Sequence, residues 1–191
     1  MTLKNSDITV GILGLQGAFH KHQKMLERLS VNTIKIRYPE EIQQCDGIIL
    51  PGGESTTMTK LLKNMEMFEP LNNYNGPVFG TCAGAILLST DCHDKRVKHL
   101  KKIPVQTTRN AFGRQIESFV TNIEVTGFDA PYPGVFIRAP QFVDLTKNIE
   151  IVGTLGNKPV FLKYENILVT SFHPELTEDT RIHEYFLNMI R

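Results

Sequence analysis

The sequence lacks the features that mark several large classes of protein. No apolar run approaches the roughly 18 residues that a membrane-spanning helix needs, so we expect no contact with a membrane. The three cysteines are odd in number and form no C-x-x-C pair, which argues against a disulfide framework and favours a reducing cytosol. Lys and Arg (21) nearly balance Asp and Glu (20), so charge gives no reason to expect nucleic acid as a partner.

The start of the chain also lacks a secretion signal. MTLKNSDITV has no basic start followed by an unbroken apolar segment, so we expect a cytoplasmic protein. The 191 residues contain 41% hydrophobic side chains, enough for a sizeable core. Because no repeat, linker or break in composition interrupts them, we predict a single domain over residues 1–191.

What is present is an alternation of short apolar segments with helical ones in the first half. Strands are predicted over 8–15, 32–37, 46–51 and 76–80, and helices over 20–29, 55–68 and 83–89. We expect Ser55 to be the N-cap of the second helix. Such alternation is typical of an α/β protein with a parallel sheet and helices on its faces.

The second half contains closely spaced strands. They are predicted over 116–125, 134–140, 149–156, 159–165 and 166–172, before a last helix over 178–191. These strands indicate an antiparallel or mixed extension of the same sheet. The basic cluster Asp94–Lys102 is most simply a solvated loop or helix face, and a patch that docks a partner is the alternative.

The segment GTCAG places Cys82 between Gly80 and Gly84, after an apolar run and before a helical one. This matches a nucleophile elbow, a sharp strand-to-helix turn in which glycines avoid a clash and the nucleophile is exposed. The start of a helix favours the thiolate form. The competing interpretation is a small buried cysteine of the core.

A thiol nucleophile needs a base, and His173 is the best placed of the six histidines. It ends an apolar strand, and Glu175 two residues later shares its face of an extended segment, so Glu175 can orient the ring. The other histidines lie in polar surroundings, where we expect solvated side chains: His20, His22, His93, His99 and His183.

The segment PGGEST, residues 51–56, follows an apolar strand and precedes a helix. Its two glycines can direct backbone N–H groups at a developing negative charge. The alternative is an ordinary strand-to-helix turn. A phosphate-binding P-loop is not indicated, because its G-x-x-x-x-G-K-[ST] pattern is absent.

Six motifs together carry a family resemblance over almost the full chain. In order they are GLQGAF, ILPGGESTT, FGTCAG, RNAFGRQ, FIRAP and SFHPELTED. The chain resembles the glutaminase subunits of pyridoxal 5′-phosphate synthases, which are triad (class I) glutamine amidotransferases. The resemblance implies a three-layer, flavodoxin-like α/β fold with a mixed sheet and helices on both faces. One departure is HLKKIPVQTTRN, which is more basic than the family's usual segment.

The resemblance implies hydrolysis of L-glutamine to L-glutamate and ammonia by Cys82, His173 and Glu175. It also implies an oxyanion hole made by the backbone N–H groups of Gly53 and Ala83. The substrate-binding residues that it implies are Gly53, Glu54, Ser55, Arg109, Ile137 and Arg138.

A separate (β/α)₈ synthase subunit is the implied partner and consumer of ammonia, in a large hetero-oligomer. Pyridoxal 5′-phosphate would then be the product of the complex, so we expect no cofactor in this chain. We also expect no metal, because the His and Cys spacings form no ligand set. Two alternatives remain. One is a thiol hydrolase or a glutaminase of another pathway, and the other is a catalytically silent binding subunit.

Overall fold

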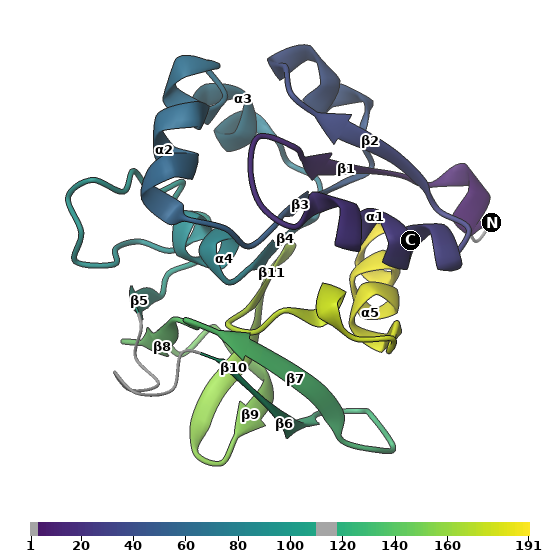
Figure 1. Cartoon of the computed structure of the whole chain (residues 1–191), viewed down its shortest axis with the longest axis vertical. Helices are drawn as coiled ribbons and strands as arrows, with labels where there is room; N and C mark the ends of the chain where they lie inside the picture. Colours follow the sequence, from purple (N-terminus) through teal and green to yellow (C-terminus); the bar gives the residue numbers. More distant parts are fainter. Residues whose placement is uncertain (1–3, 110–117) are drawn as a thin grey trace.

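The computed structural model describes residues 4–109 and 118–191 (Figure 1). The rest of the RNAFGRQ motif after Arg109 lies outside the described residues. The strands are β1 (Thr9–Leu13), β2 (Asn32–Ile36), β3 (Gly47–Leu50), β4 (Val78–Thr81), β5 (Gln106–Thr108), β6 (Ser118–Val125), β7 (Tyr132–Ile137), β8 (Gln141–Val143), β9 (Glu150–Leu155), β10 (Lys158–Tyr164) and β11 (Ile167–Thr170). The helices are α1 (Phe19–Arg28), α2 (Ser55–Asn64), α3 (Phe68–Asn73), α4 (Ala83–Leu88) and α5 (Arg181–Ile190), with 3-10 turns η1 (Asn5–Asp7), η2 (Pro39–Gln44) and η3 (Pro174–Leu176).

A nine-stranded mixed sheet runs through the molecule in the order β2-β1-β3-β4-β11-β10-β9-β6-β7. The strands from β2 to β11 pair in parallel, and β10, β9, β6 and β7 continue the sheet in antiparallel fashion. This confirms the predicted α/β class and the mixed extension. The small β5–β8 sheet was not predicted, because three residues are too short to show an alternating pattern.

Helices cover both faces of the sheet, with α2, α3 and α4 on one face and α1 and α5 on the other (Figure 1). The alternation along β3 shows why. Ile48 and Leu50 belong to the cluster that α2, α3 and α4 cover, whereas Ile49 belongs to the cluster under α1 and α5. Because successive strand side chains point to opposite faces, an all-apolar strand needs a helix layer on each side.

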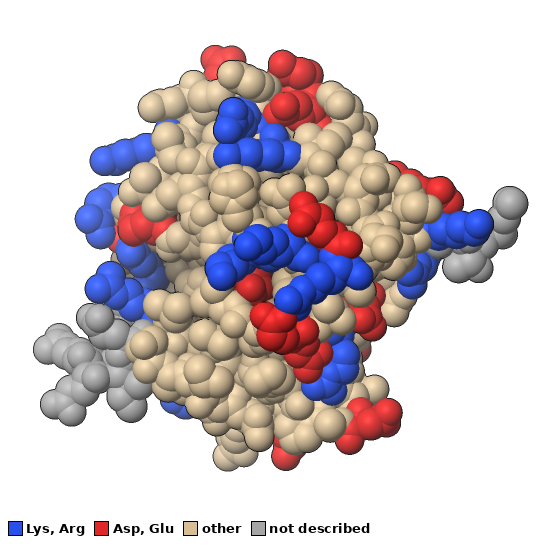
Figure 2. Space-filling model, turned by 45° about the vertical axis from the view of Figure 1, so that its right-hand side comes forward, with Lys and Arg blue, Asp and Glu red and all other residues tan. Residues whose placement is uncertain are grey.

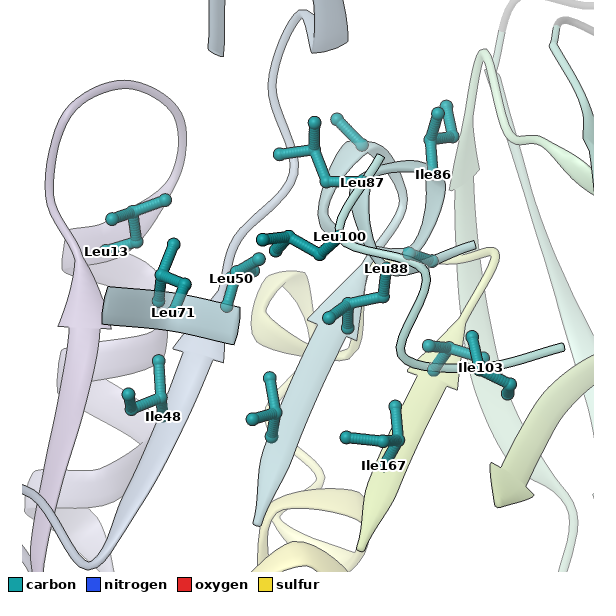
Figure 3. Packing of buried hydrophobic residues seen from close by; sticks show 14 of the residues in the cluster. Leu13, Ile48, Leu50, Leu71, Ile86, Leu87, Leu88, Leu100, Ile103 and Ile167 are labelled. Carbon is teal, nitrogen blue, oxygen red and sulfur yellow. The ribbon is translucent and has the colours of Figure 1, made fainter. Parts of the chain in front are cut away.

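The loop after α4 also contributes to the core. Figure 3 shows Leu100 and Ile103 joining Leu87 of α4 and Ile167 of β11 in the same cluster. The basic segment Asp94–Lys102 is therefore a loop rather than a helix face, and part of it is anchored in the core instead of being fully solvated.

Two local predictions around the second helix are wrong. The predicted helix over 55–68 is two helices, because the chain turns at Glu66, which has a φ of +54°. The N-cap is Glu54 rather than Ser55. The Glu54 carboxylate accepts the backbone N–H of Thr57 at 2.8 Å, and Ser55 is the first helical residue.

Charges of both signs are interspersed over the face shown in Figure 2. No helix in residues 4–109 and 118–191 is long and apolar enough to cross a membrane.

Candidate active site

The turn between β4 and α4 holds Cys82 in an uncommon backbone conformation. Its φ of +48° and ψ of −104° are of the kind that costs about 1–3 kcal/mol and persists only where the surroundings impose it. A Cβ on Gly84 would lie 1.9 Å from the Leu50 carbonyl oxygen, and a Cβ on Gly80 would lie 2.8 Å from the carbonyl carbon of Gly84. The two glycines therefore allow the close approach of strand and helix that creates the sharp turn.

His173 and Glu175 follow the neighbouring strand. Because β11 pairs in parallel with β4, with Thr170 opposite Thr81, the residues just beyond both strands meet at one edge of the sheet. His173 Nδ1 lies 2.7 Å from Glu175 Oε1, and both side chains are almost entirely buried. The spacing of two residues brings the ring and the carboxylate into direct contact.

Burial and neighbouring groups set the charges of this pair. Burial disfavours the imidazolium of His173, but the Cys82 side chain and Glu175 outweigh it and raise the pKa of His173 from 6.5 to about 10. Burial also disfavours the carboxylate of Glu175, but the rings of His22 and His173 outweigh it and lower the pKa of Glu175 to about 2. A protonated His173 thus lies beside the Cys82 sulfur at neutral pH.

A pocket of about 480 Å³ opens at this edge of the sheet. Every predicted site residue lines it except Glu175, which lies behind His173. The lining residues are Gly17, Ala18, Gly52, Gly53, Glu54, Ser55, Cys82, Ala83, Ile86, Arg109, Ile137, Arg138, His173 and Leu176. A larger hollow of about 840 Å³ lies between η2, α2 and α3, and no predicted site residue is among those described as lining it.

The Gly52–Gly53 loop packs closely on the ring of His173. A Cβ on Gly52 would lie 2.3 Å from His173 Cε1, and a Cβ on Gly17 would lie 1.8 Å from the Gly52 carbonyl oxygen. A Cβ on Gly53, by contrast, would meet nothing closer than 3.4 Å. Neither Gly52 nor Gly53 has a positive φ. Close approach therefore requires glycine at position 52, whereas position 53 has room for a methyl group in this conformation.

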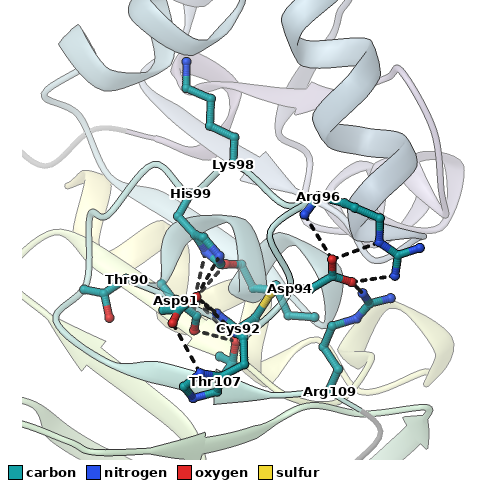
Figure 4. A network of polar contacts seen from close by, with 12 residues as sticks. Thr90, Asp91, Cys92, Asp94, Arg96, Lys98, His99, Thr107 and Arg109 are labelled. Carbon is teal, nitrogen blue, oxygen red and sulfur yellow. Dashed lines mark hydrogen bonds and ion pairs between the residues drawn. The ribbon is translucent and has the colours of Figure 1, made fainter.

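A polar network reaches the pocket from the loop after α4 (Figure 4). Asp94 Oδ2 lies 2.5 Å from Arg109 Nη1 and 2.7 Å from Arg96 Nη2, and Arg109 Nη2 lies 3.0 Å from Glu54 Oε1. Hydrogen bonds from Arg96, together with the nearby charge of Arg109, hold the pKa of Asp94 well below its usual range. Arg109 is thus held between two carboxylates.

The pKa of the Glu54 carboxyl group is lowered as well. Burial disfavours its carboxylate, but hydrogen bonds from Thr56 and Thr57 outweigh that effect and lower the pKa of Glu54 to about 2. The carboxylate therefore stays ionised while it caps α2 and pairs with Arg109.

Three further predicted residues surround the sulfur and the pocket mouth. The Ser55 Oγ is buried and has no hydrogen-bond partner among the described residues. Cys82 Sγ lies 3.8 Å from the carbonyl oxygen of Ile137, and Arg138 follows with a φ of +44°. The end of β7 therefore bends around Cys82.

Comparison with known proteins shows which family the chain belongs to. The model of the SNO glutamine amidotransferase family matches residues 12–191. The chain belongs to the SNO glutamine amidotransferase family. A pyridoxal 5′-phosphate synthase subunit PdxT from Thermosipho africanus is 49% identical, covering 95% of this chain and 98% of that protein. The PdxT of Thermotoga maritima is 46% identical, covering 95% and 99% of the two chains.

A solved structure described as a glutamine amidotransferase agrees with this SNO family member in fold. It has a TM-score of 0.90 and 40% identity, and covers 95% of this chain and 98% of that chain. The resemblance to glutaminase subunits of pyridoxal 5′-phosphate synthases is thereby confirmed.

The prediction that the other five histidines are solvated is wrong for three of them. His22 and His183 are completely buried, and the side chain of His99 is only 7% exposed, whereas His20 and His93 are exposed as predicted. Helical spacing is the signal that was overlooked. His22 lies three and four residues before buried Met25 and Leu26, so it belongs to the apolar face of α1.

Within the described residues, no group of three or more His, Cys, Asp and Glu side chains is arranged to hold a metal ion.

Proposed function

We propose that this chain hydrolyses L-glutamine to L-glutamate and ammonia, and that the ammonia serves a pyridoxal 5′-phosphate synthase. The observation that carries this proposal is one pocket that combines Cys82 in a strained turn with the buried His173–Glu175 pair and two arginines. The PdxT relatives, named as subunits of such a synthase, support the choice of pathway.

The proposed reaction begins with the Cys82 thiolate, which attacks the side-chain amide carbon of glutamine. The imidazolium of His173 protonates the departing nitrogen, ammonia leaves, and a thioester forms on Cys82. His173 then takes a proton from water, the resulting hydroxide adds to the thioester carbon, and the thiolate departs from glutamate. Glu175 holds the ring of His173 and stabilises its charged form.

The oxyanion of each tetrahedral intermediate would bind the backbone N–H groups of Gly53 and Ala83. Both residues line the pocket with Cys82. Losing one such donor typically costs a factor on the order of 10²–10³ in rate.

The charged ends of free glutamine would be bound by opposite charges of the pocket. Arg109 and Arg138 would bind the α-carboxylate, since a guanidinium fork matches its two oxygens. Glu54 would bind the α-ammonium. Glu54 and Arg109 pair with each other, so each would exchange this contact for one end of the zwitterion. Ser55 Oγ and the backbone of Ile137 would add polar contacts.

The partner in this proposal is a synthase barrel subunit, within a large hetero-oligomer in the cytoplasm, and this chain acts as its single glutaminase domain. Ammonia released into water is largely protonated and is then no nucleophile. A partner that receives it directly would avoid that loss.

The test is co-purification with the synthase subunit, followed by an assay of pyridoxal 5′-phosphate formation. The complex with Cys82→Ala should make product from added ammonium salts but not from glutamine, and Cys92→Ala, in the same chain, should use both. Hydrolysis of glutamine without product formation would assign the chain to another pathway. No hydrolysis by the intact complex would contradict the proposed activity.

A further inference from the structure

The buried network behind the base extends beyond Cys82, His173 and Glu175. His22 of α1 places its Nε2 3.4 Å from Glu175 Oε2 and 3.3 Å from Thr81 Oγ1. Its Nδ1 lies 3.0 Å from Nε2 of His183 in α5. Thr81 directly precedes Cys82, so His22 contacts both the strand that leads to the nucleophile and the carboxylate behind the base.

All of these groups are removed from water. His22, Thr81 and His183 are 0% exposed, and Glu175 is 3% exposed. A buried ionised carboxylate needs donors on both oxygens. His173 supplies a donor to Oε1, and Oε2 has no hydrogen bond among the described residues; His22 Nε2, at 3.4 Å, is the nitrogen that the structure places against it.

These contacts favour one placement of the protons on the ring nitrogens. The Glu175 carboxylate only accepts, so the arrangement that satisfies it has a proton on His22 Nε2, which lies 3.4 Å from Glu175 Oε2 and 3.3 Å from Thr81 Oγ1. In a neutral ring the Nδ1 is then bare and accepts the Nε2–H of His183. His183 Nδ1 is bare as well, and it is a buried atom without a partner among the described residues.

The alternative of a charged His22 fits these contacts less well. Both of its nitrogens would donate, so His183 would have to accept at Nε2 and carry its proton on the unpartnered Nδ1. A buried donor without an acceptor is rarer than an acceptor without a donor. Burial acts in the same direction, because it lowers the pKa of His22 and lowers that of His183 to about 3.

We propose that His22 is a positioning residue of the active site: its neutral ring donates Nε2–H toward Glu175 Oε2 and so holds the carboxylate against His173, while His183 maintains the required tautomer. This inference rests on the proposed function, since it assigns His22 to the support of the base. In this arrangement Glu175 Oε1 contacts the ring of His173, and Glu175 Oε2 contacts the ring of His22.

The test compares three variants of the full chain in complex with the synthase subunit. His22→Leu removes the donor, His22→Gln keeps an N–H donor, and His20→Gln is a control on the exposed side of the same helix. We expect His22→Leu to lower kcat for glutamine hydrolysis about tenfold or more, the scale of one lost hydrogen bond to a charged group, with little change in KM. His22→Gln should recover most of the loss, and His20→Gln should match the wild type.

The dependence of kcat on pH separates positioning from a purely structural role. The titratable groups that interact with His22 are Glu175 and His173 beyond β11 and His183 in α5. Without the His22 donor, Glu175 takes up a proton more easily, so the acidic limb of the profile should move toward neutral pH in His22→Leu. A folded His22→Leu variant with the kcat and pH profile of the wild type would overturn the proposal.

Two measurements that need no turnover distinguish this inference from the proposed function. Ring ¹⁵N resonances of the wild-type chain should show His22 and His183 as neutral Nε2–H tautomers from about pH 5.5 to about pH 8, where an ordinary histidine titrates. A charged or Nδ1–H ring at His22 would refute the assignment. The pH profile of Cys82 alkylation by iodoacetamide should change in His22→Leu but not in His20→Gln. If the wild-type complex hydrolyses no glutamine, the proposed function fails, and these measurements still decide the role of His22.

Discussion

Among single residues, the three buried cysteines differ in their surroundings. Cys82 lies in the pocket beside protonated His173, whereas burial is the main reason that the pKa values of the Cys45 and Cys92 thiols are raised, that of Cys45 to about 11. A thiol-directed glutamine analogue should therefore label Cys82 and spare the other two, and Cys82→Ala should abolish hydrolysis. Peptide mass spectrometry of the labelled chain is the measurement. Label mainly on Cys45 or Cys92 would contradict the assignment of the nucleophile.

Gly52 is a residue at which a single added methyl group should displace the ring of His173. In Gly52→Ala the new Cβ would lie 2.3 Å from His173 Cε1, so the ring must move. Misplacing a catalytic group by about 1 Å can cost about 10²-fold, and we expect kcat to fall on that scale. Steady-state kinetics with glutamine measures the effect. An unchanged kcat would show that the His173 ring can move aside without losing its function.

Among the structural elements, the loop after α4 supports the pocket through Asp94. Asp94→Asn should weaken the hold on Arg109, so we expect KM for glutamine to rise several-fold, with a smaller effect on kcat. Arg109→Ala and Arg138→Ala should raise KM further, and Arg→Lys should not restore it, because lysine lacks the planar fork. Lys101→Ala, an exposed change in the same loop, is the control. Wild-type kinetics in both Arg→Ala variants would remove these arginines from the site.

For the whole molecule, the His173–Glu175 pair makes folding stability depend on pH in two ranges. The pKa of Glu175 is about 2 in the folded chain against 4.5 ordinarily, so its contribution is present above pH 4.5 and is lost as pH falls toward 2. The pKa of His173 is about 10 against 6.5, so its contribution is present below pH 6.5 and is lost as pH rises toward 10.

The difference in Tm between wild type and Glu175→Gln should therefore be largest between pH 4.5 and 6.5 and shrink on both sides. Thermal unfolding monitored by circular dichroism measures it. Glu178→Gln is the matched control, because the Glu178 side chain is 85% exposed. A difference that is constant across pH would show that the pair is not charged in the folded chain.

A second prediction for the whole molecule is that the isolated chain hydrolyses glutamine slowly and that the synthase subunit activates it through kcat. We assume that the Gly52–Gly53 peptide of the isolated chain points its carbonyl into the site and that the partner selects the rotated peptide, whose N–H completes the oxyanion hole; glycine tolerates either sign of φ. Gly53→Ala fits the present conformation, in which φ is not positive, but resists a positive φ. It should therefore fold normally and respond less to the partner. Full activity of the isolated chain, unchanged by the partner, would show that the hole is already formed.

The sequence alone specifies those parts of the protein that depend on neighbouring residues. Apolar alternation predicts the central strands, and the G-x-C-x-G pattern predicts the turn at Cys82, because only glycine permits so close a strand–helix contact. The spacing of His173 and Glu175 likewise places the two side chains on one face. Each of these depends on sterics or periodicity within a few residues.

The tertiary structure decides the features in which distant segments meet. The contact of His22 with His183 joins residues 161 positions apart, and Asp94 reaches Arg109 because the intervening loop packs into the core. A polar side chain on a helix is buried or solvated according to which face the sheet covers, and its protonation follows from the partner that it meets there. Helical spacing can place His22 on the apolar face of α1, but local sequence carries no record of its partners, which it meets only when α1 and α5 pack together behind Glu175.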